Sequence, residues 1–219
     1  MNLGRPFAVV TPTLDGDVLQ VLAGAKASFT APQVHRLVEG WSESGVRRTL
    51  HRLVEQGIVR SDTVGRTAAY RLNRRHLAAD HVIGIAQLRV RLLEAIAVEV
   101  DGWDPWPSGV ALFGSAATGA MTTKSDIDVF VVRPVGTRGE EMPMSEADDE
   151  RWEGQVAELS RLIGEWTGND ARVLVFTDRE VFSAARSGAP LEPVLADIAE
   201  HGIWVVGSSA DLRPESTAG

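Results

Sequence analysis

The sequence predicts an α+β protein of two units, and three observations lead to that prediction. Residues 1–79 read as helices followed by two short strands, whereas later residues alternate strands with helices. Residues 1–79 carry 11 Lys and Arg against 6 Asp and Glu, a net charge of +5, while residues 80–219 carry 11 against 24, a net charge of −13. The Pro- and Gly-rich segment "DGWDPWPSG" at 101–109 breaks the chain just before the alternating strands and helices begin. Two parts with different partners are therefore expected.

Helical periodicity and capping residues predict three helices in the first unit. They run through "GDVLQVLAGA" behind Asp15, through "APQVHRLVEG" behind Thr30, and through "SGVRRTLHRLVEQG". The segment "IVRSDTVGRTAAYRLN" then reads as two strands around a Val-Gly-Arg turn. Three helices followed by a hairpin are typical of a winged helix-turn-helix, which we expect over residues 1–79.

The third of these helices carries a basic side. A winged helix of this kind would place that side on DNA, with Arg60, Arg66 and Arg71 of the hairpin touching the backbone or minor groove. The predicted DNA contacts are Arg47, Arg48, His51, Arg52 and Arg66. Two other interpretations stay open: an ordinary solvated helix face, and a protein-interaction or dimerisation module that leaves the chain as a homodimer.

The remainder of the chain reads as a connection followed by a second domain. Residues from about 75 to 100 form one predicted helix, and residues 80–108 are the expected connecting helix and linker. The second domain is expected over 109–207, ahead of a disordered tail at 208–219. Its predicted strands are 110–113, 127–132, 171–177 and 203–206, and its predicted helices are about 148–167, 179–187 and 192–201. The polar, acidic segment 133–150 reads as a loop.

Composition excludes several classes of function. The chain has no cysteine, which removes disulfides, thiolate metal sites and cysteine nucleophiles. No apolar run approaches the roughly 20 residues that a membrane span needs. The first residues lack a basic start followed by a long apolar core. We therefore expect a cytoplasmic protein with no membrane contact.

The stretch "LFGSAATGAMTTKSDIDVFVV", residues 112–132, contains the strongest functional signal. A buried strand ends at Gly114-Ser115, where a glycine turn lets backbone N–H groups approach a phosphate. Asp126 and Asp128 lie two apart at the start of the next strand and so share one face. Two adjacent carboxylates repel each other unless a cation lies between them, and Mg²⁺ prefers such oxygen ligands together with substrate phosphates. The pattern therefore predicts a phosphate turn beside a divalent-cation site.

These residues carry a resemblance to a known family. Gly114-Ser115, ten intervening residues and Asp126-Ile-Asp128 followed by "VFVV" resemble the signature of the DNA polymerase β-like nucleotidyltransferases, and among them the minimal nucleotidyltransferase domains. The resemblance covers about 109–207 and implies a small mixed-sheet domain. It implies that Gly114 and Ser115, with Lys124 and Ser125, bind the nucleotide, and that Asp126 and Asp128 are catalytic and hold Mg²⁺.

The chain departs from that family's pattern in two places. Members often carry an arginine after Gly-Ser, where this chain has "AATG" at 116–119. Many active members also place a third acid on a later strand, where this chain has "ARVLVF" with Leu174 or Val175 at the expected point. The nearby candidates for a third acid are Asp170 and Asp178.

Two functions from different classes follow. The first is a Mg²⁺-dependent nucleotidyltransferase. It would take a nucleoside monophosphate from ATP or another nucleoside triphosphate, in the leading case AMP from ATP, and transfer it to a hydroxyl of a protein or small molecule. In this reading the winged helix binds DNA or positions a partner. The alternative is a DNA-binding transcriptional regulator with a degenerate, nucleotide-sensing domain, which the two departures favour. An antitoxin-like protein that acts through direct contact is a third possibility.

Overall fold

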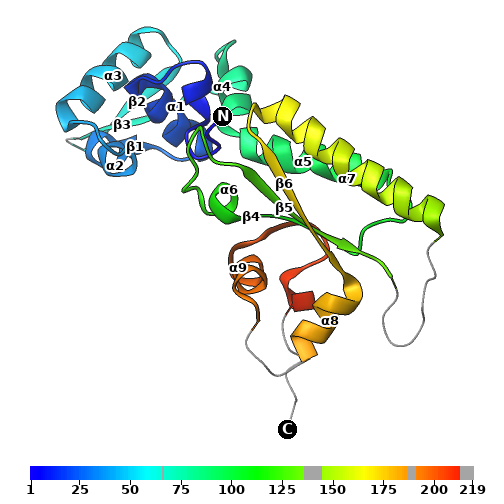
Figure 1. Cartoon of the computed structure of the whole chain (residues 1–219). Helices are drawn as coiled ribbons and strands as arrows, with labels where there is room; N and C mark the ends of the chain where they lie inside the picture. Colours follow the sequence, from blue (N-terminus) through cyan, green and yellow to red (C-terminus); the bar gives the residue numbers. More distant parts are fainter. Residues whose placement is uncertain (66, 136–144, 187–190, 213–219) are drawn as a thin grey trace. The chain divides into compact units, whose positions relative to one another are not determined.

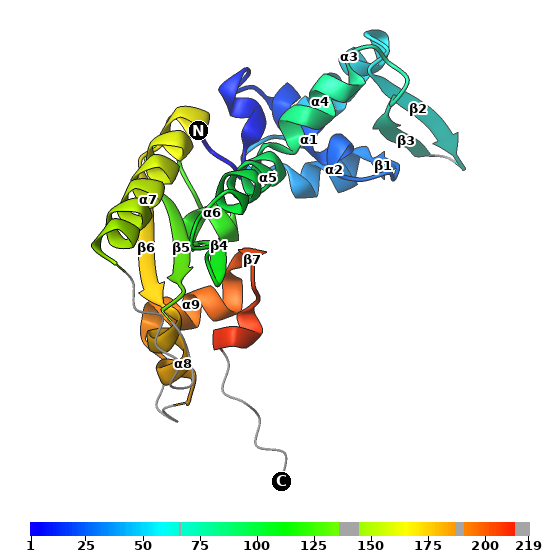
Figure 2. The same ribbon diagram turned by 90° about the vertical axis from the view of Figure 1, so that its right-hand side faces the viewer.

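The computed structural model describes residues 1–65, 67–135, 145–186 and 191–212, which form two compact units (Figures 1 and 2). One unit is Asn2–Arg89, and the other is Val90–Gly219 together with Met1. Residues 80–108, predicted as the connection, are divided between these units. No helix in the described ranges combines the length and the apolar character needed to cross a membrane.

The first unit contains helices and a small antiparallel sheet in the order that the sequence suggests. Its sheet has the strand order β1-β3-β2, and the short β1 was not predicted. The helical elements are η1 (Pro6–Val9), α1 (Leu14–Gly24), α2 (Ala31–Leu37), α3 (Glu43–Glu55) and α4 (Ala79–Ala86). The strands are β1 (Phe29–Thr30), β2 (Val59–Val64) and β3 (Thr67–Leu72).

Local capping explains where these helices begin. The side chain of Thr30 and that of Gln33 form a reciprocal capping box at α2. The Ser42 hydroxyl accepts a hydrogen bond from the Gly45 N–H at 3.2 Å and caps α3. The prediction that Asp15 caps α1 is wrong, because the N-cap is Thr13 and Asp15 lies within the first turn.

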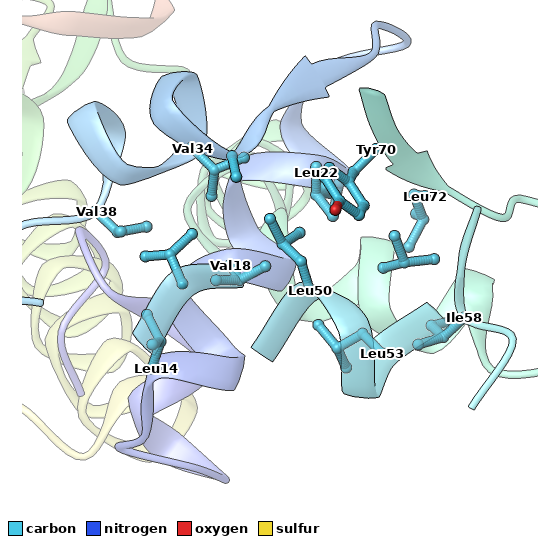
Figure 3. Close-up of a cluster of buried hydrophobic side chains, with 14 of the residues drawn as sticks. Leu14, Val18, Leu22, Val34, Val38, Leu50, Leu53, Ile58, Tyr70 and Leu72 are labelled. Carbon is cyan, nitrogen blue, oxygen red and sulfur yellow. The ribbon is translucent and has the colours of Figure 1, made fainter. Parts of the chain in front are cut away.

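One apolar core holds the first unit together. Figure 3 shows side chains of α1, α2, α3 and the hairpin converging, among them Val18, Leu22, Val34 and Leu50, none of which is solvent-exposed. Tyr70 of β3 closes the core from the sheet side. The core therefore fixes α3 against the hairpin, with its charged residues on the opposite side.

The structure differs from the predicted single helix between residues 75 and 100. Two helices form instead, α4 and then α5 (Leu88–Asp101), and they meet at Gln87. Gln87 has φ −99° and ψ 15°, outside helical geometry, while its N–H still bonds to the Ile83 carbonyl. Gly84 lies inside α4 and lowers helix propensity there.

The second unit is built on a four-stranded mixed sheet, and the predicted α+β class with a mixed sheet is confirmed. The strand order is β6-β5-β4-β7, with β5 and β6 parallel and the other pairs antiparallel. The strands are β4 (Gly109–Phe113), β5 (Ile127–Arg133), β6 (Ala171–Thr177) and β7 (Ile203–Val206). The helical elements besides α5 are α6 (Gly114–Thr118), α7 (Glu146–Thr167), α8 (Asp178–Arg186), α9 (Pro193–His201) and η2 (Ser209–Leu212).

The two faces of this sheet have different covers. α7 connects the parallel strands β5 and β6 and lies along one side of the sheet, while α8 and α9 lie on the other (Figure 1). Phe130 of β5 and Leu174 of β6 pack with side chains of α8 and α9. Because side chains alternate along a strand, Asp128 and Arg172, each two residues earlier, share the face of α8 and α9.

Two predicted irregular segments differ in part. Ser209–Leu212, placed by the sequence in the tail, form η2, and Leu212 is fully buried. Residues 213–219 lie outside the described residues. In the predicted acidic loop, α7 already begins at Glu146 behind the capping box of Ser145 and Asp148, and residues 136–144 also fall outside.

Candidate functional site

The turn between β4 and α6 lies directly against a carboxylate of β5. Gly114 has φ +63°, in the left-handed region that favours glycine. A Cβ on Gly114 would lie 2.8 Å from Oδ2 and 3.5 Å from Cγ of Asp128. Glycine is therefore needed twice, for the backbone conformation and for the close approach. The predicted Gly114-Ser115 turn and the predicted carboxylate pair thus come together in space.

The carboxylate pair is short of positive charge. Among the described residues, Asp126 has one ion-pair partner, Arg172, whose Nε lies 2.7 Å from Oδ2 of Asp126, and the Asp126 side chain is 28% exposed. Burial raises the pKa of Asp128; the charge of Arg172 acts to lower it, and the charges of Asp126 and Asp197 raise it further. Burial therefore disfavours the ionised form of Asp128, and the charge of Arg172 does not fully offset this effect on its pKa.

The neighbouring strand β6 places a different residue beside Asp126 and Asp128 than the sequence predicts. The register of β5 and β6 places Arg172 opposite Asp128, whereas Leu174 and Val175, the expected positions of a third acid, lie opposite Phe130 and Val131. Asp178 follows the far end of β6, about 20 Å along the strand, and its Oδ1 accepts a hydrogen bond from the Val135 N–H at 3.1 Å. Asp178 is therefore excluded as a third acid.

Two other acids lie near this end of the sheet. Asp170 is exposed and immediately precedes β6, and its carbonyl accepts a hydrogen bond from the Ile127 N–H at 2.8 Å. Asp197 of α9, which the sequence reasoning missed, is close enough to act on the pKa of Asp128. It also pairs with Nδ1 of His201 at 3.2 Å. A helix that far along the chain gives no local sequence signal for this proximity.

The buried side-chain amide of Asn169 stabilises the loop before β5 through a hydrogen bond. Asn169, 5% exposed, donates a hydrogen bond from Nδ2 to the Ser125 carbonyl at 2.9 Å. The Ser125 hydroxyl accepts a hydrogen bond from the Thr122 N–H at 2.9 Å, so it orders the loop. Lys124 is exposed, and its backbone N–H bonds to the Thr122 hydroxyl at 3.2 Å. Asn169 is a positioning residue that no motif had indicated.

The donor atoms at this site fit a hard divalent cation. Mg²⁺ is commonly held by one or two carboxylates plus substrate phosphates and waters. Asp126 and Asp128 supply two carboxylates on one face, and the side-chain-free backbone of Gly114 lies directly beside them. Among the described residues, no group of three or more His, Cys, Asp and Glu side chains is arranged to hold a metal. A ligand phosphate would thus have to complete the shell.

Residues 100–166 match the family model of a nucleotidyltransferase domain. The matched segment contains Gly114-Ser115 and the pair Asp126 and Asp128, and it ends before β6. The resemblance to nucleotidyltransferase domains is therefore confirmed over this segment. The match does not reach Arg172, Asp197 or the first unit.

Other comparisons add little. One solved structure, described as a crystal structure of the toxin-antitoxin with AMP-PNP, aligns over 57% of this chain and 75% of that chain, with 17% sequence identity and a TM-score of 0.31. A likeness at that level carries no argument about this chain. No curated protein matches it.

Outside the nucleotidyltransferase segment, the predicted DNA contacts on α3 are exposed but partly neutralised. Arg47 pairs with Glu43 at 2.6 Å, and Arg52 pairs with Asp15. The His51 ring lies edge-on to Tyr70 with centroids 6.4 Å apart. Arg48 is exposed, and Arg66 lies outside the described residues.

Proposed function

We propose that the second unit binds a nucleoside triphosphate and transfers its nucleoside monophosphate, AMP from ATP in the leading case, to a hydroxyl of a protein or small molecule. The observation that carries this proposal is the contact of the Gly114 turn with the Asp128 carboxylate, inside the segment that matches the nucleotidyltransferase model. It places a backbone turn suited to phosphate beside acids suited to a cation.

Five of the predicted residues are proposed to act in that transfer. Backbone N–H groups at Gly114 and Ser115 would bind phosphate oxygens, with Lys124 adding positive charge. Asp126 and Asp128 would hold Mg²⁺, which would supply positive charge against the phosphates of the nucleotide. The acceptor oxygen bonds to the α-phosphorus as the bond to the bridging oxygen breaks, so pyrophosphate leaves and the hydroxyl proton is released.

Transfer of label from α-labelled ATP in the presence of Mg²⁺, to the protein itself or to added extract, tests this proposal. Asp126→Asn and Asp128→Asn keep the side-chain shape and remove the charge, and each is expected to lower transfer by at least about 100-fold. Asp178→Asn is the matched control, because it removes the same charge at the far end of β6. Undiminished transfer in both site variants would refute the assignment.

A second candidate is a DNA-binding regulator whose second unit senses nucleotide without turnover. The ion pair between Arg172 and Asp126 favours it, because a cationic side chain of the protein already pairs with one of the carboxylates proposed to hold Mg²⁺. The first unit is proposed to be a winged helix-turn-helix, which the element order α1-β1-α2-α3-β2-β3 supports. A homodimer would read two half-sites.

Duplex DNA binding by the full chain tests that candidate. Arg48→Ala, on the exposed side of α3, is expected to weaken binding and to reduce the slope of log affinity against log salt by about 0.9 for one lost phosphate contact. Arg36→Ala, an exposed arginine of α2, is the charge-matched control. In this candidate function, nucleotide should change the DNA affinity without being consumed. A full chain that does not bind DNA at low salt would rule out the DNA-binding regulator.

A further inference from the structure

A basic pocket lies in the first unit, apart from the side of α3 that carries the predicted DNA contacts. Its volume is about 280 Å³, and its walls come from three segments: the connection between α1 and β1, the strands β2 and β3 at the open end of their hairpin, and the residues after β3. The cationic side chains among its lining residues are Lys26, Arg60, Arg71, Arg74 and Arg75. The tip of the hairpin at Gly65 is at the other end of the strands.

The positive charge of this pocket is not balanced within the unit. Arg60 and Arg71 are direct partners on antiparallel strands, and like charges at that position destabilise a sheet. Asp62 compensates Arg71: Nε of Arg71 donates a hydrogen bond to Oδ2 of Asp62 at 3.0 Å, and Nη2 forms an ion pair with the same oxygen at 2.9 Å. No lining residue is acidic, and for the other four cations no ion pair is found within the described part of the chain. Among the described residues, Asp62 is thus the one carboxylate that pairs with any of the five cationic side chains of the pocket.

One of the arginines is already held in place. Nη2 of Arg74 donates hydrogen bonds to the carbonyls of Ala23 at 3.2 Å and Ala25 at 3.5 Å, the latter being a wall residue of the pocket. These bonds occupy one nitrogen of the guanidinium, which has five N–H donors in total. The planar guanidinium matches the oxygens of a phosphate, and a fixed arginine loses less side-chain freedom on binding.

We propose that this pocket binds a phosphate group. Two kinds of ligand could supply this phosphate group: a free phosphorylated small molecule, or the phosphodiester backbone of a nucleic acid. The volume lies just below the 300–1,000 Å³ typical of small-molecule sites, so it fits a phosphate-bearing group and not a large apolar ligand. The site is separate from the carboxylate pair of the second unit and does not require nucleotidyl transfer.

Calorimetric titration of the full chain with inorganic tripolyphosphate tests the proposal. EDTA is present so that the Mg²⁺-dependent site of the second unit does not contribute. The double variant Arg60→Ala/Arg75→Ala removes two exposed pocket charges, and it is expected to lower the affinity at least about 10-fold. The control Arg36→Ala/Arg91→Ala removes two other exposed arginines and lowers the net charge equally, with an expected change below about twofold. Thermal unfolding checks that both doubles fold.

A second arm replaces tripolyphosphate with a duplex of arbitrary sequence. If the wild type binds tripolyphosphate and only the pocket double loses it, the source is a free phosphorylated molecule. If the wild type binds only the duplex and the pocket double alone loses that binding, the source is a nucleic-acid backbone. Equal losses in the two doubles would show general electrostatic attraction and overturn the proposal, as would a wild type that binds neither probe.

Discussion

Replacing Gly114 with alanine tests the geometry on which the proposed nucleotide site depends. At φ +63° an L side chain is strained by about 1–2 kcal/mol. The new Cβ would also lie 2.8 Å from Asp128 Oδ2, closer than real Cβ atoms approach another atom, so the turn or the carboxylate must shift. Gly114→Ala therefore combines backbone strain with displacement of a proposed cation ligand.

Gly168→Ala separates those two effects. Gly168 ends α7 with φ +70°, and a Cβ there would meet nothing within 4 Å. Both variants should lose about 1–2 kcal/mol of unfolding free energy, which lowers Tm by roughly 2–8 °C for a chain of this size. Only Gly114→Ala should lower Mg²⁺-dependent ATP affinity, by at least about 10-fold.

Circular dichroism melting and calorimetric titration with ATP and Mg²⁺ give the two readouts. The reasoning is refuted if Gly114→Ala binds ATP as well as Gly168→Ala does, since the close approach to Asp128 would then have no role in binding. Equal melting temperatures for Gly114→Ala and the wild type would show that the strain itself is absent.

Three further variants probe the surroundings of the site. Arg172→Ala removes the exposed ion pair with Asp126, which is worth up to about 1 kcal/mol. The variant should therefore lower the Mg²⁺ concentration needed for half-maximal ATP binding by at most about fivefold. Weaker ATP binding would instead mean that Arg172 contacts phosphate. Asn169→Ala leaves the carbonyl of the loop before Asp126 without its buried partner and should cost about 1–3 kcal/mol in denaturant unfolding, whereas an unchanged midpoint would contradict that role. Hydrogen bonds from the backbone N–H and hydroxyl of Thr177 hold the pKa of Glu180 below its usual 4.5. The stability that ionised Glu180 contributes is thus complete above pH 4.5 and is lost as the pH falls below that value. The difference in unfolding free energy between the wild type and Glu180→Gln should therefore shrink between pH 6 and pH 3. A difference that stays constant over this range would refute the stabilising role of Glu180.

Much of the fold was predictable because local patterns specify it. The strands at 127–132, 171–177 and 203–206 were predicted within one residue of their ends, since short apolar runs bounded by turns are typical of strands. The close approach of Gly114 to Asp128 follows from the spacing between the Gly-Ser turn and the carboxylate pair. These features depend on residues that are close in sequence.

The parts that sequence reasoning missed depend on long-range placement. Arg172 faces Asp128 only because the crossover through α7 sets the register of two parallel strands. Asp197 reaches the same end of the sheet through the packing of α9 on α6 and β4. The basic pocket joins three segments of the first unit, and Arg60 and Arg71 become neighbours only through strand pairing. Neither register nor helix packing has a local signature.

A crystal structure of the protein with Mg²⁺ and a non-hydrolysable ATP analogue tests the central claim most directly. We expect a cation bound by Asp126 and Asp128, with the triphosphate against the backbone of Gly114 and Ser115 and the ion pair of Arg172 with Asp126 broken. A nucleotide bound elsewhere, or a carboxylate pair that keeps Arg172 and takes no cation at saturating ligand, would contradict it.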